Sequence, residues 1–290
     1  MKKILITGGA GSVGGELTRK LADRGYQVRV FDLPFMDFSA LEALEGIEIV
    51  KGDITDSATV QAAVDGVDLV LHLAALLPFA SERDREKTFA VNVGGTRNLV
   101  QGIKNTGGKA RLVFSSTVAT YGDTTAGEPP VGIDHPQNPL DIYGESKVAA
   151  EKAILEGGIP YTILRISGVV IPALLEPADP YPFMRDQRME FVARADVVSA
   201  LLASVEREEA ADKIFIIAGG PTWQMRGHEY VEKLFEILDV DIEDASYRDT
   251  PWWSDWYDTA EAQAVLDYQN TPFSLYLEQL DQAIAEALGL

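Results

Sequence analysis

The chain has 290 residues, which at about 150 residues per domain suggests two units, or one large α/β domain with an appended lobe. It carries 25 Lys and Arg against 45 Asp and Glu, and the formal net charge of −20 excludes nucleic acid and anionic membrane surfaces as partners, because both require a basic face. The sequence contains no cysteine, which excludes disulfides, thiolate metal sites and cysteine nucleophiles.

No stretch reaches the ~18 consecutive apolar residues that a membrane helix needs. The first residues, Met1 to Thr7, run into glycines rather than into a long apolar region with a cleavage site. We therefore expect a cytoplasmic protein without a membrane partner. Its acidity is explained by solubility or, alternatively, by a salt-rich cytoplasm.

Short β-branched runs alternate with helical patterns along the first 220 residues. The runs predicted as strands are Ile4–Thr7, Gln27–Asp32, Ile47–Gly52, Val67–Leu73, Arg111–Ser116, Tyr161–Ile166 and Lys213–Ile217. The predicted helices are Val13–Arg24, Ser57–Val64, Glu82–Lys104, Ile142–Glu156 and Ala195–Glu206, followed by Gly227–Leu238, Thr259–Leu266 and Ser274–Leu288. This alternation predicts an α/β fold: a doubly wound parallel sheet of the Rossmann type with a small, mostly helical C-terminal substrate lobe.

Two segments interrupt the alternation, Tyr121–Pro139 and Gly168–Arg188, both rich in proline. They are predicted to be long loops, and loops of this length in a compact domain are usually functional.

Three glycines follow the first strand directly and open the first helix, in the segment Thr7–Gly14. Gly8 permits a tight turn, Gly11 has no side chain to keep a pyrophosphate away, and Gly14 lets helix and strand pack closely. The phosphates would then lie on the N–H groups of the helix N-terminus, at Ser12 and Val13. An ordinary strand-to-helix turn is the alternative.

Asp32 closes the second strand, 18 residues after Gly14, where a carboxylate holds the ribose hydroxyls of NAD. No basic residue follows it in Leu33-Pro34-Phe35, and its charge would repel a 2′-phosphate. We therefore predict NAD rather than NADP as the cofactor.

Tyr143 and Lys147 lie four residues apart in a predicted helix, for which Asp141 is a plausible N-cap. This spacing places both side chains on one face. A neighbouring ammonium favours the phenolate and lowers the tyrosine pKa, so Tyr143 is a candidate general acid and base. A surface pair is the alternative.

In combination these motifs resemble the extended short-chain dehydrogenases/reductases of the NAD-dependent epimerase/dehydratase family. The markers, over residues 1–205, are Thr7–Gly14, Asp32, Gly52–Asp56, His72–Ala75, Asn92–Thr96, Phe114–Thr117 with Tyr121-Gly122, Tyr143–Lys147, Leu164-Arg165 and Asp196-Val197.

The resemblance implies a role for each matching position. Tyr143 and Lys147 would be catalytic together with Thr117, the substrate-orienting hydroxyl. Residues implied to contact the cofactor are Asp53 and Ile54 at the adenine, Leu73, Ala74 and Ala75 along its length, and Asn92, Ser115 and Lys147 near the nicotinamide. The implied domains are residues 1–167 with about 191–219 for NAD, and about 168–190 with 220–290 for the substrate.

The chain departs from the family pattern at three places. Val118 and Ala119 stand where sugar-nucleotide 4,6-dehydratases have Asp-Glu, which argues against a dehydratase. Gly168 stands where many sugar-nucleotide enzymes have an asparagine, and Arg188 lies one residue too early for the usual arginine.

Other side chains have two interpretations each. Arg185, Arg188 and Arg194 could grip an anionic substrate or form salt bridges with Asp186 and Glu190. The three tryptophans of Pro251–Tyr257 could form a substrate lid or pack in the core. Phe89, Val93 and Leu99 could line a homodimer interface or face the sheet. His72 is predicted to be structural, and no metal site is expected.

The sequence predicts an NAD-dependent oxidoreductase acting on a secondary alcohol or ketone of a sugar, a sugar derivative or another small carbonyl compound. A sugar-nucleotide epimerase is the alternative within the family. A non-catalytic NAD sensor is a third hypothesis, which retention of Tyr143, Lys147 and Thr117 argues against.

Overall fold

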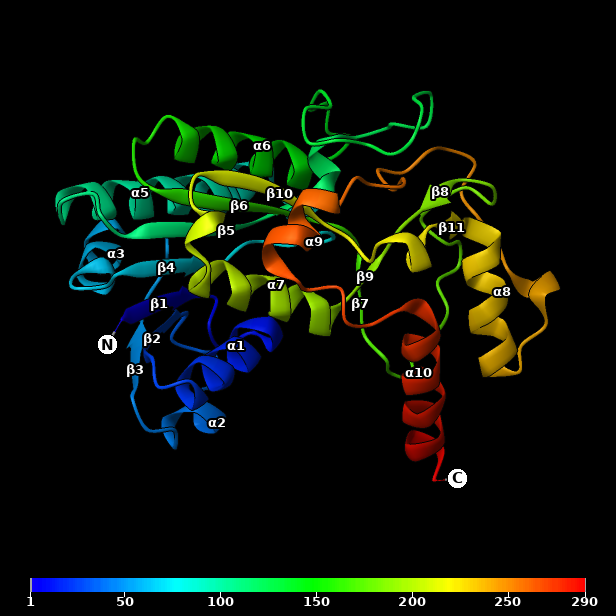
Figure 1. The fold of residues 1–290 in the computed structure, drawn as a ribbon, viewed down its shortest axis with the longest axis horizontal. Helices are drawn as coiled ribbons and strands as arrows, with labels where there is room; N and C mark the ends of the chain where they lie inside the picture. Colours follow the sequence, from blue (N-terminus) through cyan, green and yellow to red (C-terminus); the bar gives the residue numbers. More distant parts are fainter. Residues whose placement is uncertain (1, 290) are drawn as a thin grey trace.

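The computed structural model describes residues 2–289, and its centre is a seven-stranded sheet in the order β10-β6-β5-β4-β1-β2-β3 (Figure 1). All six strand pairs are parallel. The strands are β1 Lys3–Thr7, β2 Gln27–Asp32, β3 Ile47–Lys51, β4 Leu69–His72, β5 Arg111–Thr117, β6 Tyr161–Ile166 and β10 Lys213–Ile217. Each predicted strand is present, and the predicted Rossmann-type sheet is confirmed.

Successive residues of the central strands enter opposite cores, which explains their continuous apolar runs. In β1, Ile4 and Ile6 pack into one cluster while Leu5 packs into the other. In β4, Leu69 and Leu71 pack into the same cluster as Ile4 and Ile6, and Val70 packs into the cluster that contains Leu5. Every such strand is therefore covered on both faces.

Helices cover the two faces in separate groups (Figure 1). One face carries α3 Ser57–Val64, α5 Gly95–Asn105 and α6 Ile142–Leu155. The other carries α1 Ser12–Asp23, α2 Ser39–Glu42, α7 Arg194–Glu206 and α9 Ala260–Leu266. The chain order reverses between neighbours β1 and β4, and a ligand crevice forms at the carboxyl ends of strands at such a point.

The long helix predicted over residues 82–104 is present over residues 85–105, but it starts later and contains a π-helical turn. A 3₁₀ turn Ser81–Arg83 precedes α4 Arg85–Phe89, a π-helical turn Ala90–Gly94 and then α5. Asp84 starts α4 by accepting a hydrogen bond from Lys87 N at 2.9 Å. The π turn places Asn92 inward, as described below.

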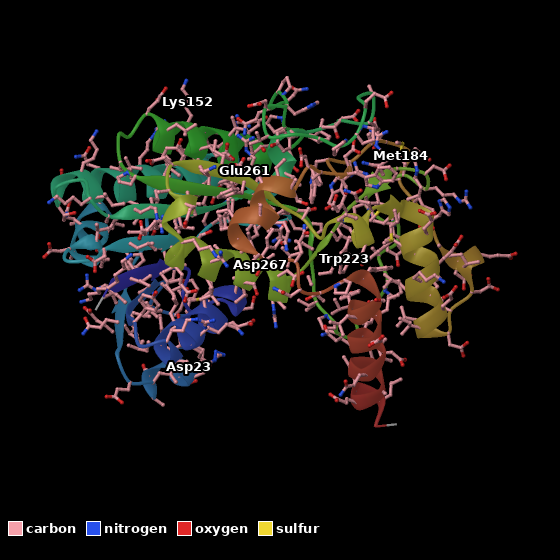
Figure 2. The ribbon with its side chains drawn as sticks, viewed as in Figure 1. Asp23, Lys152, Met184, Trp223, Glu261 and Asp267 are labelled. Atoms are coloured by element: carbon pink, nitrogen blue, oxygen red, sulfur yellow. The ribbon has the colours of Figure 1, made fainter. Side chains whose placement is uncertain are left out.

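The lobe beyond the sheet contains α8 Gly227–Leu238 and α10 Phe273–Leu288, which stand apart at one end of the molecule (Figure 1). Its short strands pair as β7 Val169–Val170 with β9 Val192–Ala193, and as β8 Arg188–Met189 with β11 Met225–Arg226. Further 3₁₀ turns are Val118–Thr120, Glu208–Ala210, Pro221–Trp223 and Ile242–Asp244. Trp223, labelled in Figure 2, packs on Phe273 of α10 with ring centroids 4.9 Å apart.

α9 lies on the sheet rather than in the lobe, although it follows α8 in the chain. Its Ala262 and Leu266 belong to the core beneath α7, and Glu261 and Asp267 mark its two ends in Figure 2. The C-terminal segment thus returns to the sheet before α10 leaves it. Within residues 2–289, no helix has the length and apolar character needed to cross a membrane.

Candidate functional site

The glycine turn after β1 brings three chain segments into direct contact. Gly8 has φ +73, and a Cβ there would lie 2.8 Å from Ala74 N in the segment after β4. A Cβ on Gly14 would lie 2.3 Å from the carbonyl oxygen of Gly8. Neither contact tolerates a side chain, so α1 can begin against the turn only because both residues are glycine.

The N-terminus of α1 fits a phosphate group. Its N-cap, Gly11, provides no side-chain hydrogen bond to the helix, and a Cβ there would meet only Gly8 O at 3.3 Å. The first N–H groups of α1, those of Ser12 and Val13, therefore have no side-chain cap. Such a helix end presents N–H donors and a positive dipole to an anion, as the pyrophosphate of NAD requires.

Asp32 stands at the end of β2, beside this turn. Its Oδ2 accepts a hydrogen bond from Ala10 N at 3.0 Å, and its Oδ1 accepts one from Leu33 N at 2.9 Å. The carboxylate thereby orients the glycine turn, and each oxygen retains a further lone pair for a ribose hydroxyl. Asp53 accepts from Thr55 N at 2.9 Å, and Ile54 is buried against Gly95.

Asn92 fastens the segment after β4, which contains Leu73, Ala74 and Ala75, to the helix α6. Its Oδ1 accepts from Leu76 N at 2.8 Å, while its Nδ2 donates to Leu76 O at 3.1 Å and to Ser146 Oγ at 2.9 Å. The side chain is 2% exposed. Asn92 thus joins two segments beside the predicted nicotinamide region, the chain after β4 and the helix α6.

His72 is held between two threonines at the end of β4. Its ring nitrogens lie 2.8 Å from Thr7 Oγ1 and 3.0 Å from Thr96 Oγ1. Burial, with the charge of Lys147 as a smaller cause, lowers the pKa of His72 to about 3. A neutral ring with both nitrogens bonded agrees with the predicted structural role.

Tyr143 lies in the first turn of α6, whose free N–H groups receive two carboxylates. Asp141 Oδ1 accepts from Gly144 N at 2.6 Å. Glu82 accepts from Ile142 N at 3.0 Å and from Tyr143 N at 3.1 Å. No sequence signal indicated Glu82, since it lies about 60 residues earlier in the chain.

Lys147 lies on the same helix face, as its spacing predicts. Its Nζ donates to Ser115 O at 2.7 Å and lies 5.6 Å from the ring centroid of Tyr143. Burial lowers the pKa of Lys147 to about 7, against an opposing effect of Glu151.

The expected lowering of the Tyr143 pKa is not found in the protein alone. Burial raises that pKa, and the negative charge of Asp141 adds to the effect. Burial also disfavours the ammonium of Lys147, the charge that was expected to lower the pKa of Tyr143.

Thr117 ends β5 and lies 6% exposed at the site. Its Oγ1 accepts from Ala119 N at 3.1 Å. A Cβ on Gly144 would lie 2.9 Å from Ala119 O, so the start of α6 meets the turn after Thr117 closely. Tyr143, Lys147 and Thr117 thus come from α6 and β5 to the carboxyl end of the sheet.

A buried ion pair, which sequence analysis did not single out, stands behind this site. Arg165 Nη2 lies 2.8 Å from Glu151 Oε2, with exposed fractions of 6% and 1%. Arg165 also donates to Tyr121 Oη at 2.8 Å, and Gln137 donates to Glu151 at 2.9 Å. The pair therefore anchors the loop Tyr121–Pro139 to α6 and β6.

The predicted arginine cluster does not assemble as one group, because each arginine lies beside a different carboxylate. Arg188 Nη2 donates to Asp255 Oδ2 at 2.9 Å. Arg185 lies 3.6 Å from Asp186, and Arg194 lies 3.7 Å from Glu16. The structure therefore favours salt bridges over an anion grip, with Asp255 rather than Glu190 as the partner of Arg188.

The aromatic segment Pro251–Tyr257 packs into the molecule. Trp253 is 8% exposed and shares a cluster with Tyr121 and Tyr257, and the ring of Trp252 packs against it at a tilt of 37°, with centroids 3.9 Å apart. Trp256 Nε1 donates to Met225 O at 3.2 Å. These contacts favour core packing over a free lid.

Among the residues from 2 to 289, no group of three His, Asp or Glu side chains is arranged as a metal site.

Comparison with known proteins identifies the family. The model of the NAD dependent epimerase/dehydratase family matches residues 4–218. The chain belongs to this family. The matched range contains the glycine turn, Asp32, Thr117, Tyr143 and Lys147, and the family's dependence on NAD agrees with the predicted cofactor.

Curated relatives of the chain differ in activity. It is 39% identical over 158 residues to a 3 beta-hydroxysteroid dehydrogenase/Delta 5-->4-isomerase of Mycobacterium tuberculosis, covering 53% of this chain and 42% of the relative. A D-erythronate dehydrogenase of Cupriavidus necator is 34% identical over 157 residues, covering 51% and 48%. A UDP-glucose 4-epimerase of Streptomyces lividans is 29% identical over 252 residues, covering 75% of each. The chain thus matches less than half the length of the first two.

Solved structures share the whole fold. A short-chain dehydrogenase/reductase superfamily protein from Agrobacterium tumefaciens with bound NAD is 24% identical, with a TM-score of 0.80 over 99% of this chain and 98% of that one. A UDP-glucose 4-epimerase from Thermotoga maritima is 23% identical, with a TM-score of 0.81 over 99% of both chains. At this identity the likeness concerns the fold.

Proposed function

We propose that this protein is an NAD-dependent oxidoreductase that transfers hydride between NAD and a secondary alcohol or ketone. One observation supports the proposal: Lys147 lies 5.6 Å from the Tyr143 ring and bonds Ser115 of β5, two residues before Thr117 at the carboxyl end of that strand. The glycine turn follows β1 at the same end of the parallel sheet. A reacting carbon at this edge would lie between a hydroxyl pair and a dinucleotide site.

The cofactor-binding part of the proposal assigns the pyrophosphate to Gly8, Gly11, Ser12, Val13 and Gly14. Asp32 would hold the adenosine ribose, and Asp53 with Ile54 would face the adenine. Leu73, Ala74 and Ala75 would run along the cofactor, with Asn92, Ser115 and Lys147 at its nicotinamide end. When bound, oxidised NAD would supply the hydride acceptor and a positive ring charge.

Proton transfer is assigned to Tyr143. During oxidation its phenolate takes the hydroxyl proton, the carbon loses hydride, and the C–O bond becomes a carbonyl. Thr117 donates a hydrogen bond to the same substrate oxygen and orients it. Because burial raises the pKa of Tyr143, the phenol form dominates in the protein alone, and a positive charge beside it would favour the phenolate.

An epimerase of sugar nucleotides is the second candidate, supported by the Streptomyces relative that matches three quarters of the chain. The residues that could hold a diphosphate argue against it. Gly168 replaces the usual asparagine, and Arg188 is paired with Asp255. We also propose that the protein is not a 4,6-dehydratase, because Val118 and Ala119 are apolar and buried.

Assembly and location are part of the proposal as well. We infer a cytoplasmic homodimer formed through α5 and α6. Leu99 and Val93 cannot carry that interface, since they are buried at 0% and 3% exposure within the chain. The substrate would lie between the NAD domain, residues 1–167 with about 191–219, and the lobe formed by about 168–190 with 220–290, although α9 within the second range packs on the sheet.

The test is reduction of NAD with a panel of sugars, uronates, sugar nucleotides and ring alcohols. Turnover with one class is expected, and Tyr143→Phe should lower kcat by about 10²- to 10⁴-fold while NAD still binds. Tyr161→Phe is the matched control, because Tyr161 is the first residue of β6 and lies at the amino ends of the strands, away from the proposed site. Full turnover in Tyr143→Phe would contradict the mechanism.

A further inference from the structure

A cavity of about 280 Å³ lies inside the lobe, outside the cofactor site described above. Its walls come from the loop after β6, from α8 and from α10. The helices contribute Leu234, Leu238 and Leu280, with Tyr230 and Tyr276 beside them. Within each helix these residues are four positions apart, so they lie on one face of that helix.

The cavity begins close to the reactive end of the sheet. Ile166 of β6 pairs with Thr117 of β5, and the next cavity residue along the chain is Val169. Phe191 separates the cavity from Gly168, where a Cβ would lie 2.5 Å from the phenyl ring. The chain therefore passes from Ile166, the partner of Thr117 in the sheet, to the cavity wall at Val169 within three residues.

The wall facing solvent is also apolar. Leu175 and Val169 line the cavity, yet they are 61% and 47% exposed. Leu174, next to them in the same loop, is 42% exposed. Large apolar side chains grouped on a surface beside a cavity mark a binding site more often than isolated ones do.

The charges around the cavity do not suit an anion. Glu176 is the only ionisable acid or base, apart from the tyrosines, among the residues that line it. Arg188 and Arg194 are each paired with a carboxylate elsewhere, and the whole chain carries −20. A neutral hydrocarbon group meets none of the repulsion that a diphosphate would meet here.

We propose that this cavity binds the non-reacting hydrocarbon part of the substrate, an alkyl chain or alicyclic ring attached to the secondary alcohol or ketone. The assignment rests on the proposed function and specifies its substrate class. The volume is just below the range of complete ligand pockets, about 300–1,000 Å³, as expected for a space that holds one part of a molecule.

The test is calorimetric titration of the full chain with 2-butanone, 2-hexanone and 2-octanone. The Kd should fall about fourfold for each added methylene that enters the cavity, and the heat capacity of binding should become more negative. In Leu175→Ser the Kd of 2-octanone should rise about fivefold, while that of 2-butanone changes little.

Leu288→Ser is the matched control. Leu288 ends α10, is 60% exposed and does not line the cavity, so the same exchange should leave all three Kd values as they are. The proposal is overturned if Kd is independent of chain length, or if both variants weaken 2-octanone equally. It is also overturned if Leu175→Ser leaves ketone binding intact but converts a dimer to a monomer in light scattering.

An assay of NADH oxidation separates this proposal from the function on which it rests. If small polar ketones are reduced and Kd does not depend on chain length, the cavity assignment fails and the function stands. If 2-octanone binds as described but no carbonyl compound is reduced, the proposed function fails instead.

Discussion

Asp32 and Lys147 show how single side chains combine structural and functional tasks. Asp32 bonds the backbone of the glycine turn at Ala10 and also provides the negative charge expected to select NAD. Lys147 bonds the backbone of β5 at Ser115 and lies 5.6 Å from the ring of Tyr143, the proposed acid and base. The proposed functional role of each side chain can be tested separately from its backbone hydrogen bond: cofactor preference for Asp32, and the dependence of stability on pH for Lys147.

Asp32→Asn should weaken NAD binding by about tenfold, because a neutral amide forms weaker hydrogen bonds with ribose hydroxyls than a carboxylate does. The same change should strengthen NADP binding, since repulsion of the 2′-phosphate is removed. Fluorescence titration with both dinucleotides measures the ratio. Asp23→Asn, at the far end of α1, serves as the control, and a wild-type ratio in Asp32→Asn would refute the assignment.

Lys147 should make stability rise with pH. Its pKa is about 7 in the folded protein and about 10.4 when unfolded, so the unfolded chain binds more protons between these values and stability increases with pH across them. Lys147→Met should remove most of this rise between pH 7 and 9 in urea unfolding.

Lys152→Met is the control for that measurement, because Lys152 is exposed on the same helix (Figure 2). It should retain the wild-type dependence of stability on pH. An unchanged dependence in Lys147→Met would show that Lys147 remains charged in the folded protein.

At the level of elements, α6 is defined by its N-terminus. Asp141 and Glu82 together bond three of its first N–H groups, and this fixes the turn that carries Tyr143. The charge of Asp141 also raises the pKa of Tyr143. The start of the helix therefore affects both the position and the acidity of the phenol.

Asp141→Ala should lower the free energy of unfolding by about 1 kcal/mol, the usual cost of losing an N-cap. It should also lower the pKa of Tyr143, so the acid limb of the oxidation rate should move to lower pH. Urea unfolding and a kcat pH profile measure the two effects.

Asp56→Ala removes an equivalent cap from α3, where Asp56 accepts from Ala58 N at 3.0 Å. A similar loss of stability with an unchanged pH profile is expected there. If both variants shift the profile alike, Asp141 acts on Tyr143 only through general stability.

At the level of the whole molecule, Glu190 joins the sheet to the lobe. Its carboxylate accepts hydrogen bonds from Gly220 N at 2.8 Å, Gln224 Nε2 at 3.0 Å and Tyr257 N at 2.9 Å. Glu190 is 0% exposed, and burial raises its pKa to about 7. Two segments beyond β10, the turn around Pro221–Trp223 and the chain at Tyr257, thus bond to one buried acid.

Glu190 should make stability fall as pH rises from about 4.5 to 7, because the folded chain then binds more protons than the unfolded chain. Glu190→Gln should flatten this fall in thermal unfolding, whatever its effect on absolute stability. Glu209→Gln, at an exposed position, should leave the slope unchanged. An unaltered slope in Glu190→Gln would assign the fall to other groups.

Local patterns in the sequence determined much of this protein. The seven strands follow from short β-branched runs, the glycine turn from the spacing of its glycines, and the shared face of Tyr143 and Lys147 from the helical period of about 3.6 residues. None of these patterns needs knowledge of distant contacts. The π turn at residues 90–94 did not follow, because Asn92 within it bonds Leu76 and Ser146, contacts that no local period indicates.

The tertiary structure alone decided which side chains meet across the chain. It assigned Arg188 to Asp255, 67 residues away, placed Glu82 on the N-terminus of α6, and enclosed an apolar cavity between α8, α10 and the loop after β6. Burial within it raises the pKa of Tyr143, where helix spacing alone had predicted a lowering by Lys147. Pairing and desolvation depend on how the whole chain packs, and sequence spacing contains no measure of either.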